Sequence, residues 1–325
     1  MRVLITGGRG FAGSHLTDWA AQEGAEIFVL SLENESPATF TSPAARYFQV
    51  DIRDRESVRR LVREAAPDQI YHLAALSGIP ESWADPRLTY EVNVAATWNL
   101  LEAAAQLKRS PRILFVSSAT VYQSPSSPDA PLDERAAIRP SNPYSTSKAM
   151  GELLCVQQVE AGLSDIVTVR PFNHIGPRQS PAFVCSSFAR QIALMEMGLM
   201  PPVLQAGNLD VERDFTDVRD VVRAYWRVLQ KGMRGDVYNV CSGRAYSLSW
   251  VLDIFRSLTS ISFRVVVDQN RLRRQDTGRF CGNPGKMQLQ TGWSPAIPIE
   301  RSLADLLEYW RLCVPSQTPS GTSKP

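Results

Sequence analysis

The sequence has no excess of charge, no long apolar run and no clustered metal ligands, each of which would mark a specialised class of protein. Its 35 basic and 33 acidic residues give a formal net charge of +2, and no run of like charge stands out. This balance argues against nucleic acid or an anionic membrane as partner and favours a small molecule. No stretch approaches the roughly 18 unbroken apolar residues that a membrane span requires.

Cysteine and histidine are scarce and scattered. Five cysteines, an odd number without a CxxC pair, predict reduced thiols rather than a zinc or redox motif. Three histidines share no ligand spacing, so we expect no metal site. These residues are Cys155, Cys185, Cys241, Cys281 and Cys313, with His15, His72 and His174. Because Gly7 and Gly8 interrupt the first apolar run, a secretory signal peptide is not expected, and we predict a cytoplasmic protein.

The interior contains neither an internal repeat nor a Pro/Gly/Ser-rich linker. With 325 residues and 44% hydrophobic content, the chain can bury one large core or two modest ones. We therefore expect one compact unit with two lobes. Residues 314–325 are rich in Ser, Thr, Pro and Gly, which predicts a disordered tail.

Short apolar runs alternate with segments of helical periodicity in the first half. This order predicts βαβ units and a doubly wound parallel sheet in an α/β dinucleotide-binding domain over residues 1–170. Residues 171–313 are expected to form a smaller, mixed α/β substrate lobe, with some later segments returning to the first domain. The predicted strands are 2–6, 25–31, 47–52, 69–75, 112–118, 165–171, 237–240 and 263–267. The predicted helices are 11–22, 57–64, 90–107, 145–160, 183–198, 218–230, 247–258 and 299–311.

The segment ITGGRGFAG, residues 5–13, lies between the first predicted strand and the first predicted helix. Gly7, Gly10 and Gly13 would supply a tight turn, close approach to a pyrophosphate and close helix packing. The start of the helix would face the phosphate charge. This pattern is typical of the Rossmann-type dinucleotide-binding turn.

A second motif, YSTSK, begins about 130 residues later. Tyr144 and Lys148 are four apart and share one helix face, so the ammonium group could lower the pKa of the phenol. Ser118 follows the fifth predicted strand, where its hydroxyl could bond a substrate oxygen beside Tyr144. A tyrosine that passes a proton beside a nicotinamide is suited to ketone reduction. We therefore predict Ser118, Tyr144 and Lys148 as catalytic residues.

Together with VSSATVY and RPFNHIGP, these motifs resemble the extended short-chain dehydrogenase/reductase family acting on nucleotide sugars. The resemblance covers nearly the whole chain. It implies that substrate contacts come from Thr120, Asn173, Arg213, Arg273 and Asp276. It implies cofactor contacts from Gly7, Arg9, Gly10, Phe11, Gly13, Asp51, Ile52, Leu73, Ala74, Ala75, Asn93, Tyr144, Lys148 and Pro171. An arginine suits phosphate, and a carboxylate suits ribose hydroxyls.

Within that family, residues 170–243 resemble the reductases of GDP-4-keto-6-deoxyhexoses. The resemblance implies NAD(P)H-dependent reduction of a C4 ketone to a GDP-6-deoxyhexose of the GDP-D-rhamnose type. Thr120 stands where the 4,6-dehydratases carry a glutamate, and a threonine is a poor acid or base for that elimination. SATVY is also found in 4-epimerases, so an epimerase with tightly bound NAD is the alternative. A GDP-mannose 4,6-dehydratase comes next, and a non-catalytic dinucleotide-binding protein last.

The cofactor and the oligomeric state are only partly predictable. Ser31 and Leu32 stand at the end of the second strand, where an acid would grip the ribose of NAD, and Glu33 lies just beyond. Arg9 could pair with a 2′-phosphate, so NADP(H) is favoured over NAD(H). The family implies a homodimer through a four-helix bundle built from the helices 90–107 and 145–160.

Overall fold

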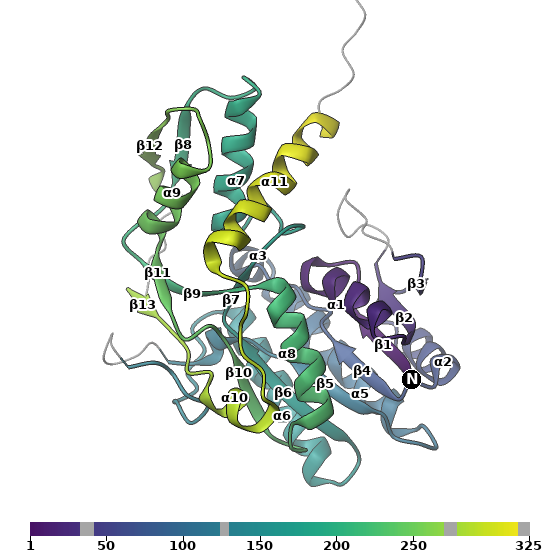
Figure 1. Ribbon diagram of the computed structural model, residues 1–325. Coiled ribbons are helices and arrows are strands. Elements are labelled where there is room, and N and C mark those ends of the chain that lie inside the picture. Colours follow the sequence, from purple (N-terminus) through teal and green to yellow (C-terminus); the bar gives the residue numbers. More distant parts are fainter. Residues whose placement is uncertain (33–41, 124–129, 270–277, 318–325) are drawn as a thin grey trace, which may run out of the picture.

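Seven parallel strands form the central sheet of the computed structural model, which describes residues 1–32, 42–123, 130–269 and 278–317 (Figure 1). The strand order is β10-β6-β5-β4-β1-β2-β3, and every pairing is parallel. This arrangement confirms the predicted doubly wound sheet. The strands are β1 (Arg2–Thr6), β2 (Glu26–Ser31), β3 (Ala45–Gln49), β4 (Gln69–His72), β5 (Arg112–Val116), β6 (Asp165–Pro171) and β10 (Val237–Val240).

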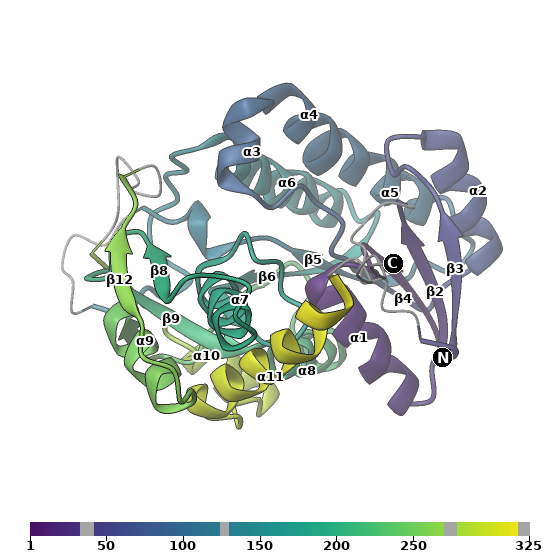
Figure 2. The ribbon, with the colours of Figure 1, turned by 90° about the horizontal axis from the view of Figure 1, so that it is seen from above.

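Alternate side chains of each strand enter two separate cores, because successive residues of a strand face opposite sides of the sheet. Val3 and Ile5 pack against α1 (Phe11–Gln22) and α8 (Val218–Lys231). Leu4 packs on the other side, which is covered by α2 (Arg55–Ala65), α5 (Ala96–Ala105) and α6 (Pro143–Glu160). Figure 2 shows these two helical layers above and below the sheet. Burial of each such side chain contributes about 1.5–3 kcal/mol.

The predicted helix 90–107 is interrupted in the structure. It consists of α4 (Pro86–Tyr90), a π-helical turn η1 (Glu91–Ala95) and α5. The side chain of Asn93, inside the π turn, bonds to the backbone of Leu76 and to Ser147, which accounts for the local rearrangement. The remaining short elements of this half are α3 (Ile79–Ala84) and the 3₁₀ turn η2 (Ala119–Val121).

The second lobe stands on the carboxyl edge of the sheet and has a core of its own. Its helices are α7 (Val184–Glu196), α9 (Leu248–Ser257) and α11 (Ile299–Gln317). The strand β8 (Val203–Ala206) pairs with β12 (Arg264–Val267), and β9 (Glu212–Asp217) pairs with three strands. Those three are β7 (Asn173–Ile175), β11 (Ala245–Ser247) and β13 (Arg279–Phe280). Sequence periodicity did not predict β7, β8, β9, β11 or β13, which are short or lack regular alternation.

The end of the chain corrects one expectation. The helix α11 runs to Gln317, so the tail predicted from Val314 begins with four helical residues, and residues 318–325 lie outside the described part. Val314 is buried against the core of the second lobe, which explains why the helix continues. No helix within the described ranges is long and apolar enough to cross a membrane.

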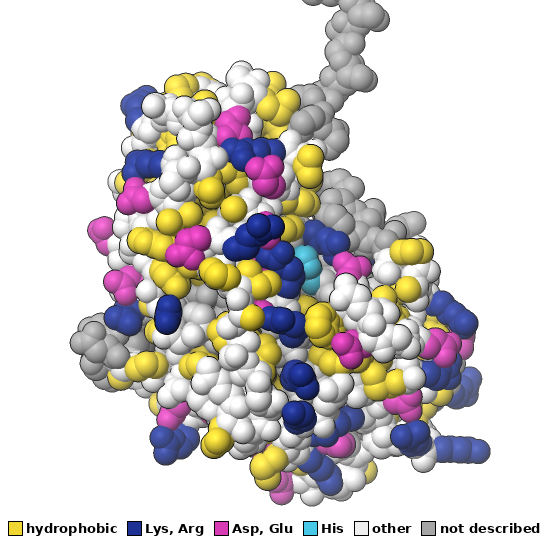
Figure 3. Space-filling view, viewed as in Figure 1, with side chains coloured by type: hydrophobic (Ala, Val, Ile, Leu, Met, Phe, Trp, Pro, Cys, Tyr) yellow, Lys and Arg dark blue, Asp and Glu magenta, His cyan; other side chains and the backbone are white. Residues whose placement is uncertain are grey.

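Two later elements, α8 and β10, return to the large sheet, and α10 (Gly285–Thr291) packs beside them. Figure 3 shows Lys and Arg side chains in a column down the face that carries α8. Arg219, Arg223 and Arg227 recur at intervals of four on this helix. Arg219 forms an ion pair with Asp217, and Arg223 forms one with Asp220, so acidic partners offset part of the column.

Candidate active site

The glycine turn after β1 is a close-packed junction that no larger residue could replace. Gly7 has φ +70°, and a Cβ there would lie 2.9 Å from the backbone of Ala74. A Cβ on Gly13 would lie 2.1 Å from the carbonyl oxygen of Gly7. Gly10 caps α1 without a side-chain hydrogen bond. The first N–H groups of α1 can therefore serve an anionic ligand.

The segment after β4 forms the next wall. Leu73 and Ala74 lie directly under the glycine turn, and Ala75 follows them. Asn93 accepts from the Leu76 N–H at 2.8 Å and donates to the Ser147 hydroxyl at 2.9 Å. It thus links the strand end to the helix that carries the predicted catalytic pair.

His72 is a core residue with two hydroxyl partners. Its Nδ1 lies 2.7 Å from the Thr6 hydroxyl, and its Nε2 lies 2.8 Å from the Thr97 hydroxyl. Burial lowers the pKa of His72 to about 3, and the nearby positive charge of Lys148 lowers it further. The imidazole is therefore neutral at physiological pH and joins β1 to α5.

Three predicted hydroxyl groups converge beyond the end of β5. The Ser118 hydroxyl lies 2.9 Å from that of Thr120, and Ser118 caps the short turn η2. Ser118 also hydrogen-bonds to the phenol of Tyr144, which enters from the first turn of α6. The structure therefore brings the predicted serine and tyrosine together, with Thr120 beside them.

The prediction that Lys148 lowers the pKa of Tyr144 is wrong. Burial raises the pKa of Tyr144, and the hydrogen bond with Ser118 opposes that rise. The ammonium group of Lys148 donates instead to the Val116 carbonyl at 2.8 Å. Lys148 is 4% exposed, and burial lowers its own pKa to about 8. In this structure the loss of water therefore sets the direction of the pKa shift at the phenol.

The far end of the glycine turn carries Arg9. Its guanidinium lies over the ring of Tyr47 in β3, 5.0 Å from the ring centroid. Its Nε is buried and has no hydrogen-bond partner among the described residues. Ser31, the last residue of β2, is buried, and Glu33 lies outside the described residues.

Asp51 and Ile52 follow β3. Ile52 is buried at the edge of the core. The Asp51 carboxylate binds the backbone and guanidinium of Arg53, which lowers the pKa of Asp51. Sequence reasoning singled out the acid but not Arg53, two residues later.

Strand pairing assembles the part of the site that is predicted to bind substrate. Pro171 ends β6, and β7 then places Asn173 opposite Phe215 in β9. The Asn173 side chain is exposed. Arg213, also in β9, donates to the Glu212 carbonyl at 2.8 Å. The structure brings Asn173 and Arg213 to one small sheet, whereas Arg273 and Asp276 lie outside the described residues.

A stack of aromatic rings joins the cofactor side to the substrate side. Phe11 of the glycine motif lies parallel to His174 of β7, with ring centroids 5.5 Å apart. His15 contacts the Pro177 carbonyl at 2.9 Å, and Arg178 forms an ion pair with Asp18 at 2.7 Å. The segment after β7 is therefore held against α1.

The comparisons with known proteins agree with this geometry. A family model described as GDP-mannose 4,6 dehydratase matches residues 4–306. A GDP-6-deoxy-D-mannose reductase from Pseudomonas aeruginosa is 36% identical over 95% of this chain and 97% of its own length. The chain belongs to the GDP-mannose 4,6 dehydratase family. The predicted resemblance to extended short-chain dehydrogenase/reductase enzymes is thereby confirmed.

Other members of this wider group are also similar. A UDP-glucose 4-epimerase from Neisseria meningitidis is 31% identical over 98% of both chains. The solved structure of RMD from Pseudomonas aeruginosa complexed with NADPH has a TM-score of 0.85 and 34% identity, covering 96% of this chain and all of that one. A Thermus thermophilus UDP-glucose 4-epimerase complexed with NAD has a TM-score of 0.85 and 30% identity, covering 96% and 99%.

This family member also contains polar groups around the site that sequence reasoning missed. Asp214, next to the predicted Arg213, is fully buried and accepts from Ser242, Gly243 and Gly282. Glu152, four residues beyond Lys148, is 6% exposed. The helical spacing from Lys148 could have identified Glu152, but no local pattern signals the burial of Asp214.

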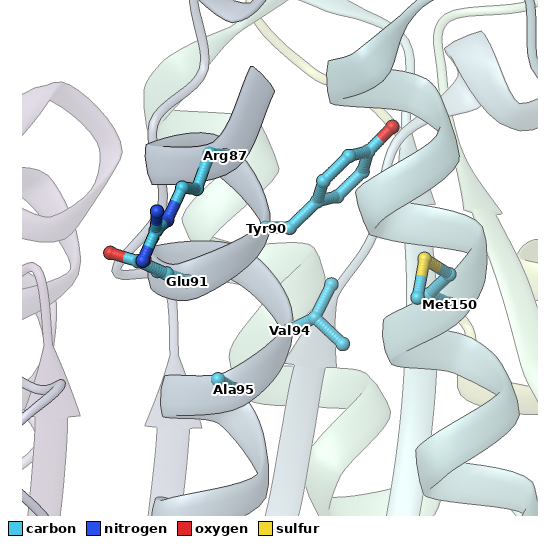
Figure 4. Close-up of a pocket in the computed structure, with 6 residues that line it drawn as sticks. All are labelled: Arg87, Tyr90, Glu91, Val94, Ala95 and Met150. Atoms are coloured by element: carbon cyan, nitrogen blue, oxygen red, sulfur yellow. The ribbon is translucent and has the colours of Figure 1, made fainter. Parts of the chain in front are cut away.

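A hollow of about 560 Å³ lies between α4, η1 and α6, and none of the predicted catalytic residues lines it (Figure 4). In Figure 4, Tyr90 and Val94 face α6 and Met150, while Arg87 and Glu91 pair on the outer side. The walls are largely apolar. The hollow therefore belongs to the helices predicted to form a dimer interface rather than to the reaction site.

Proposed function

We propose that this protein reduces the C4 ketone of a GDP-4-keto-6-deoxyhexose to a GDP-6-deoxyhexose of the GDP-D-rhamnose type. The observation that carries the proposal is the convergence of Ser118, Thr120 and Tyr144 beside Lys148, at the strand ends next to the glycine turn. The 36% identity to a GDP-6-deoxy-D-mannose reductase supports this substrate over other nucleotide sugars.

The glycine turn fits a nicotinamide dinucleotide. A side chain on Gly7 or Gly13 would collide with backbone, so the turn is shaped for close approach, and α1 presents N–H groups to a pyrophosphate. Phe11, Ala74 and Asn93 would line the same cradle, with Lys148 at the nicotinamide ribose. When bound, the reduced nicotinamide supplies hydride to the ketone carbon.

The protein's own residues manage the ketone oxygen. Ser118 would orient this oxygen through its hydroxyl, and Tyr144 would donate its phenolic proton as the alkoxide forms. A raised Tyr144 pKa keeps the phenol protonated before the reaction, as a proton donor requires. The Lys148 charge would stabilise the phenolate left behind, because opposite charges attract strongly in a buried site.

Substrate binding is assigned to the small sheet around β9. The exposed Asn173 and the guanidinium of Arg213 would contact the sugar nucleotide and its diphosphate, and Thr120 would face the sugar. Arg273 and Asp276 are proposed to reach phosphate and ribose from outside the described residues. Guanine as the base rests on similarity alone.

We assign NADP(H) as the preferred cofactor. Stacking on Tyr47, in the strand next to β2, holds the Arg9 guanidinium, and its unpaired Nε is available to a 2′-phosphate. The neighbour complexed with NADPH supports this choice. Replacing Arg9 with alanine should raise the KM for NADPH by about 10-fold or more and leave that for NADH nearly unchanged. Equal changes for both cofactors would refute the assignment.

The direct test follows the loss of NADPH absorbance with GDP-4-keto-6-deoxy-D-mannose as substrate. Stoichiometric oxidation is expected, and Tyr144→Phe should lower kcat by about 100- to 10,000-fold. Tyr90→Phe, on the neighbouring α4, is the matched control and should retain full activity. A wild-type protein that binds NADPH but oxidises none of it with this substrate would contradict the proposal.

A nucleotide-sugar 4-epimerase with tightly bound NAD is the second candidate. The 31% identity to a UDP-glucose 4-epimerase and the SATVY segment favour it. Purified protein would then carry NAD and interconvert UDP- or GDP-hexoses without consuming free NADPH. A 4,6-dehydratase is less well supported because Thr120 replaces the glutamate of those enzymes. The presence of Ser118, Tyr144 and Lys148 argues against a non-catalytic role.

A homodimer through α4–α5 and α6 is also proposed. Met150, Leu153 and Val156 are 42%, 69% and 49% exposed on α6, which is unusual for apolar side chains so close together. Replacing Leu153 with glutamate should convert a dimer to a monomer in light scattering, whereas Leu289→Glu, on the exposed α10, should not. A wild-type monomer at micromolar concentration would refute the dimer. The cytoplasmic location stays a prediction.

A further inference from the structure

Glu152 is a buried carboxylate that the proposed reaction does not use. It lies on α6, one helical turn beyond Lys148, and is 6% exposed. Arg170 of β6, itself 4% exposed, binds both carboxylate oxygens, at 2.9 Å through Nε and at 2.6 Å through Nη2. The Ser117 hydroxyl donates to the same carboxylate at 2.5 Å. A charge removed from water in this way needs such partners.

The contacts of Glu152 hold the end of β5 against α6. Lys148 donates to the carbonyl of Val116, and Glu152 accepts from the side chain of the next residue, Ser117. Between them on the helix stands Gly151, where a Cβ would lie 2.4 Å from the ring of Phe115. Two polar contacts and one close approach therefore fix α6 on the strand end.

This strand end leads directly into the proposed site. Ser118 follows Ser117, and Tyr144 precedes Lys148 by one helical turn. Any shift of α6 along β5 would change the distance between the Ser118 hydroxyl and the Tyr144 phenol. A displacement of about 1 Å at reacting groups can lower a rate by roughly 100-fold.

Glu152 is also a buried carboxylate one helical turn from Lys148. Burial lowers the pKa of Lys148 to about 8, and the neighbouring Cys155 and Glu152 both oppose that effect. The other titratable groups facing this cluster are Tyr144 and Cys155 of α6, His72 of β4 and Arg170 of β6, with Tyr122 beyond Arg170. The outer charges on elements packed against α6 are Glu81, Arg87, Glu91, Glu102 and Asp165.

We propose that Glu152 is a positioning residue: through Ser117 it fixes Ser118 opposite Tyr144, and its carboxylate supplies a buried negative charge one helical turn from Lys148. This inference rests on the proposed ketone reduction for its kinetic consequence. The competing explanation is that Glu152 serves only to neutralise the buried Arg170. The two explanations differ in what happens when both charges are removed together.

The test uses the double variant Glu152→Met/Arg170→Met, which removes both charges of the ion pair together and also removes the acceptor of the Ser117 hydroxyl. The pair lines a cavity of about 350 Å³, so the substituted side chains have room. We expect a folded protein with unchanged KM values and a kcat lowered about 10-fold. The apparent pKa above which kcat/KM decreases at alkaline pH should be lower by about 0.5–1 unit. The sign follows because removing a nearby anion lowers the pKa of an ammonium group.

Two single variants separate the roles of contact and charge. Ser117→Ala removes the contact with Glu152, so kcat should fall about 5-fold. Because this variant keeps the ion pair, the alkaline apparent pKa of kcat/KM should not change. Glu152→Asp shortens the side chain but keeps the charge. It should therefore also retain the wild-type alkaline apparent pKa of kcat/KM. A double variant with the wild-type kcat and the wild-type alkaline apparent pKa would overturn the proposal. Glu152 would then serve only to neutralise Arg170.

A second measurement needs neither cofactor nor substrate. The chain contains only five lysines, so protein labelled with ¹³C at the lysine ε-carbon should give a simple NMR spectrum, in which Lys148→Arg identifies the Lys148 signal. We expect the Lys148 titration midpoint to be about 0.5–1 unit lower in the double variant than in the wild type. An unchanged midpoint would refute the role of the charge, even if the protein reduced no ketone. A protein inactive on the proposed substrate but with the shifted midpoint would overturn the proposed function alone.

Discussion

Lys148 at the edge of the large sheet and Asp214 in the small sheet are both buried charges, yet their surroundings differ. Lys148 has three N–H donors, and among the described residues only the Val116 carbonyl accepts from them. Asp214 is saturated, since Ser242 donates twice to one oxygen, and Gly243 and Gly282 donate to the other. Unused donor capacity favours a ligand, whereas a saturated carboxylate belongs to the scaffold.

The two charged side chains also connect segments that differ in their separation along the sequence. The Val116 carbonyl and Lys148 lie in β5 and α6, the strand and the main helix of one βαβ unit. Asp214 joins β9 to the loop at Ser242 and Gly243 and to Gly282, which precedes α10. The first charge thus completes a locally built site, and the second holds distant segments together on the substrate side.

Replacing Lys148 with methionine should produce the largest effect. It removes the proposed phenolate partner, so kcat/KM should fall by about 100-fold or more. The same change removes a buried charge, so the melting temperature should rise. Calorimetry and NADPH oxidation test both parts, with Lys231→Met, exposed at the end of α8, as control. An active or a less stable Lys148→Met protein would place Lys148 in the scaffold, like Asp214.

Replacing Asp214 with asparagine should lower stability and weaken substrate binding, whereas Lys148→Met should raise stability and slow the reaction. The amide keeps one acceptor oxygen, but its NH₂ group would face backbone N–H donors, leaving buried donors unpaired at a cost of about 2 kcal/mol. The melting temperature should fall, and the KM for the nucleotide sugar should rise more than kcat falls, because segments of the substrate side lose their common anchor. Asp210→Asn, exposed nearby, should change neither quantity. A stable variant with only kcat reduced would make Asp214 part of the chemistry.

The same contrast explains what the sequence could predict. Gly7, Ser118 and Tyr144 lie at strand ends or helix starts of successive βαβ units, where spacing along the chain determines position in space. The helix α1 was predicted to the residue, and β6 likewise. The π turn at Asn93 was missed because it depends on the Leu76 backbone and the Ser147 side chain, which helical periodicity does not report.

The substrate side was harder to predict because its contacts link distant residues. The pairing of Asn173 with Phe215, and of Arg279 with Glu212, brings together short strands with no alternation of their own. The RDF motif identified Arg213, but the burial of Asp214 depends on Gly282, 68 residues later. The pKa of Tyr144 was predicted in the wrong direction because spacing shows which residues share a helix face but not how much water they lose.

The third prediction concerns the pH dependence of stability that Lys148 imposes. Its pKa is about 8 in the folded protein and near 10.5 when unfolded, so the unfolded chain binds more protons between these values. Stability therefore increases with pH across this window. The advantage of Lys148→Met over wild type should be at most about 3 kcal/mol below pH 8 and should vanish near pH 10.5. Urea unfolding of both proteins from pH 7 to 10.5 measures this difference. A constant advantage would mean that folding does not change the pKa of Lys148. An advantage that already falls between pH 7 and pH 8 would mean that Lys148 loses its proton below pH 8 in the folded protein, and its role as a cation beside Tyr144 would then fail.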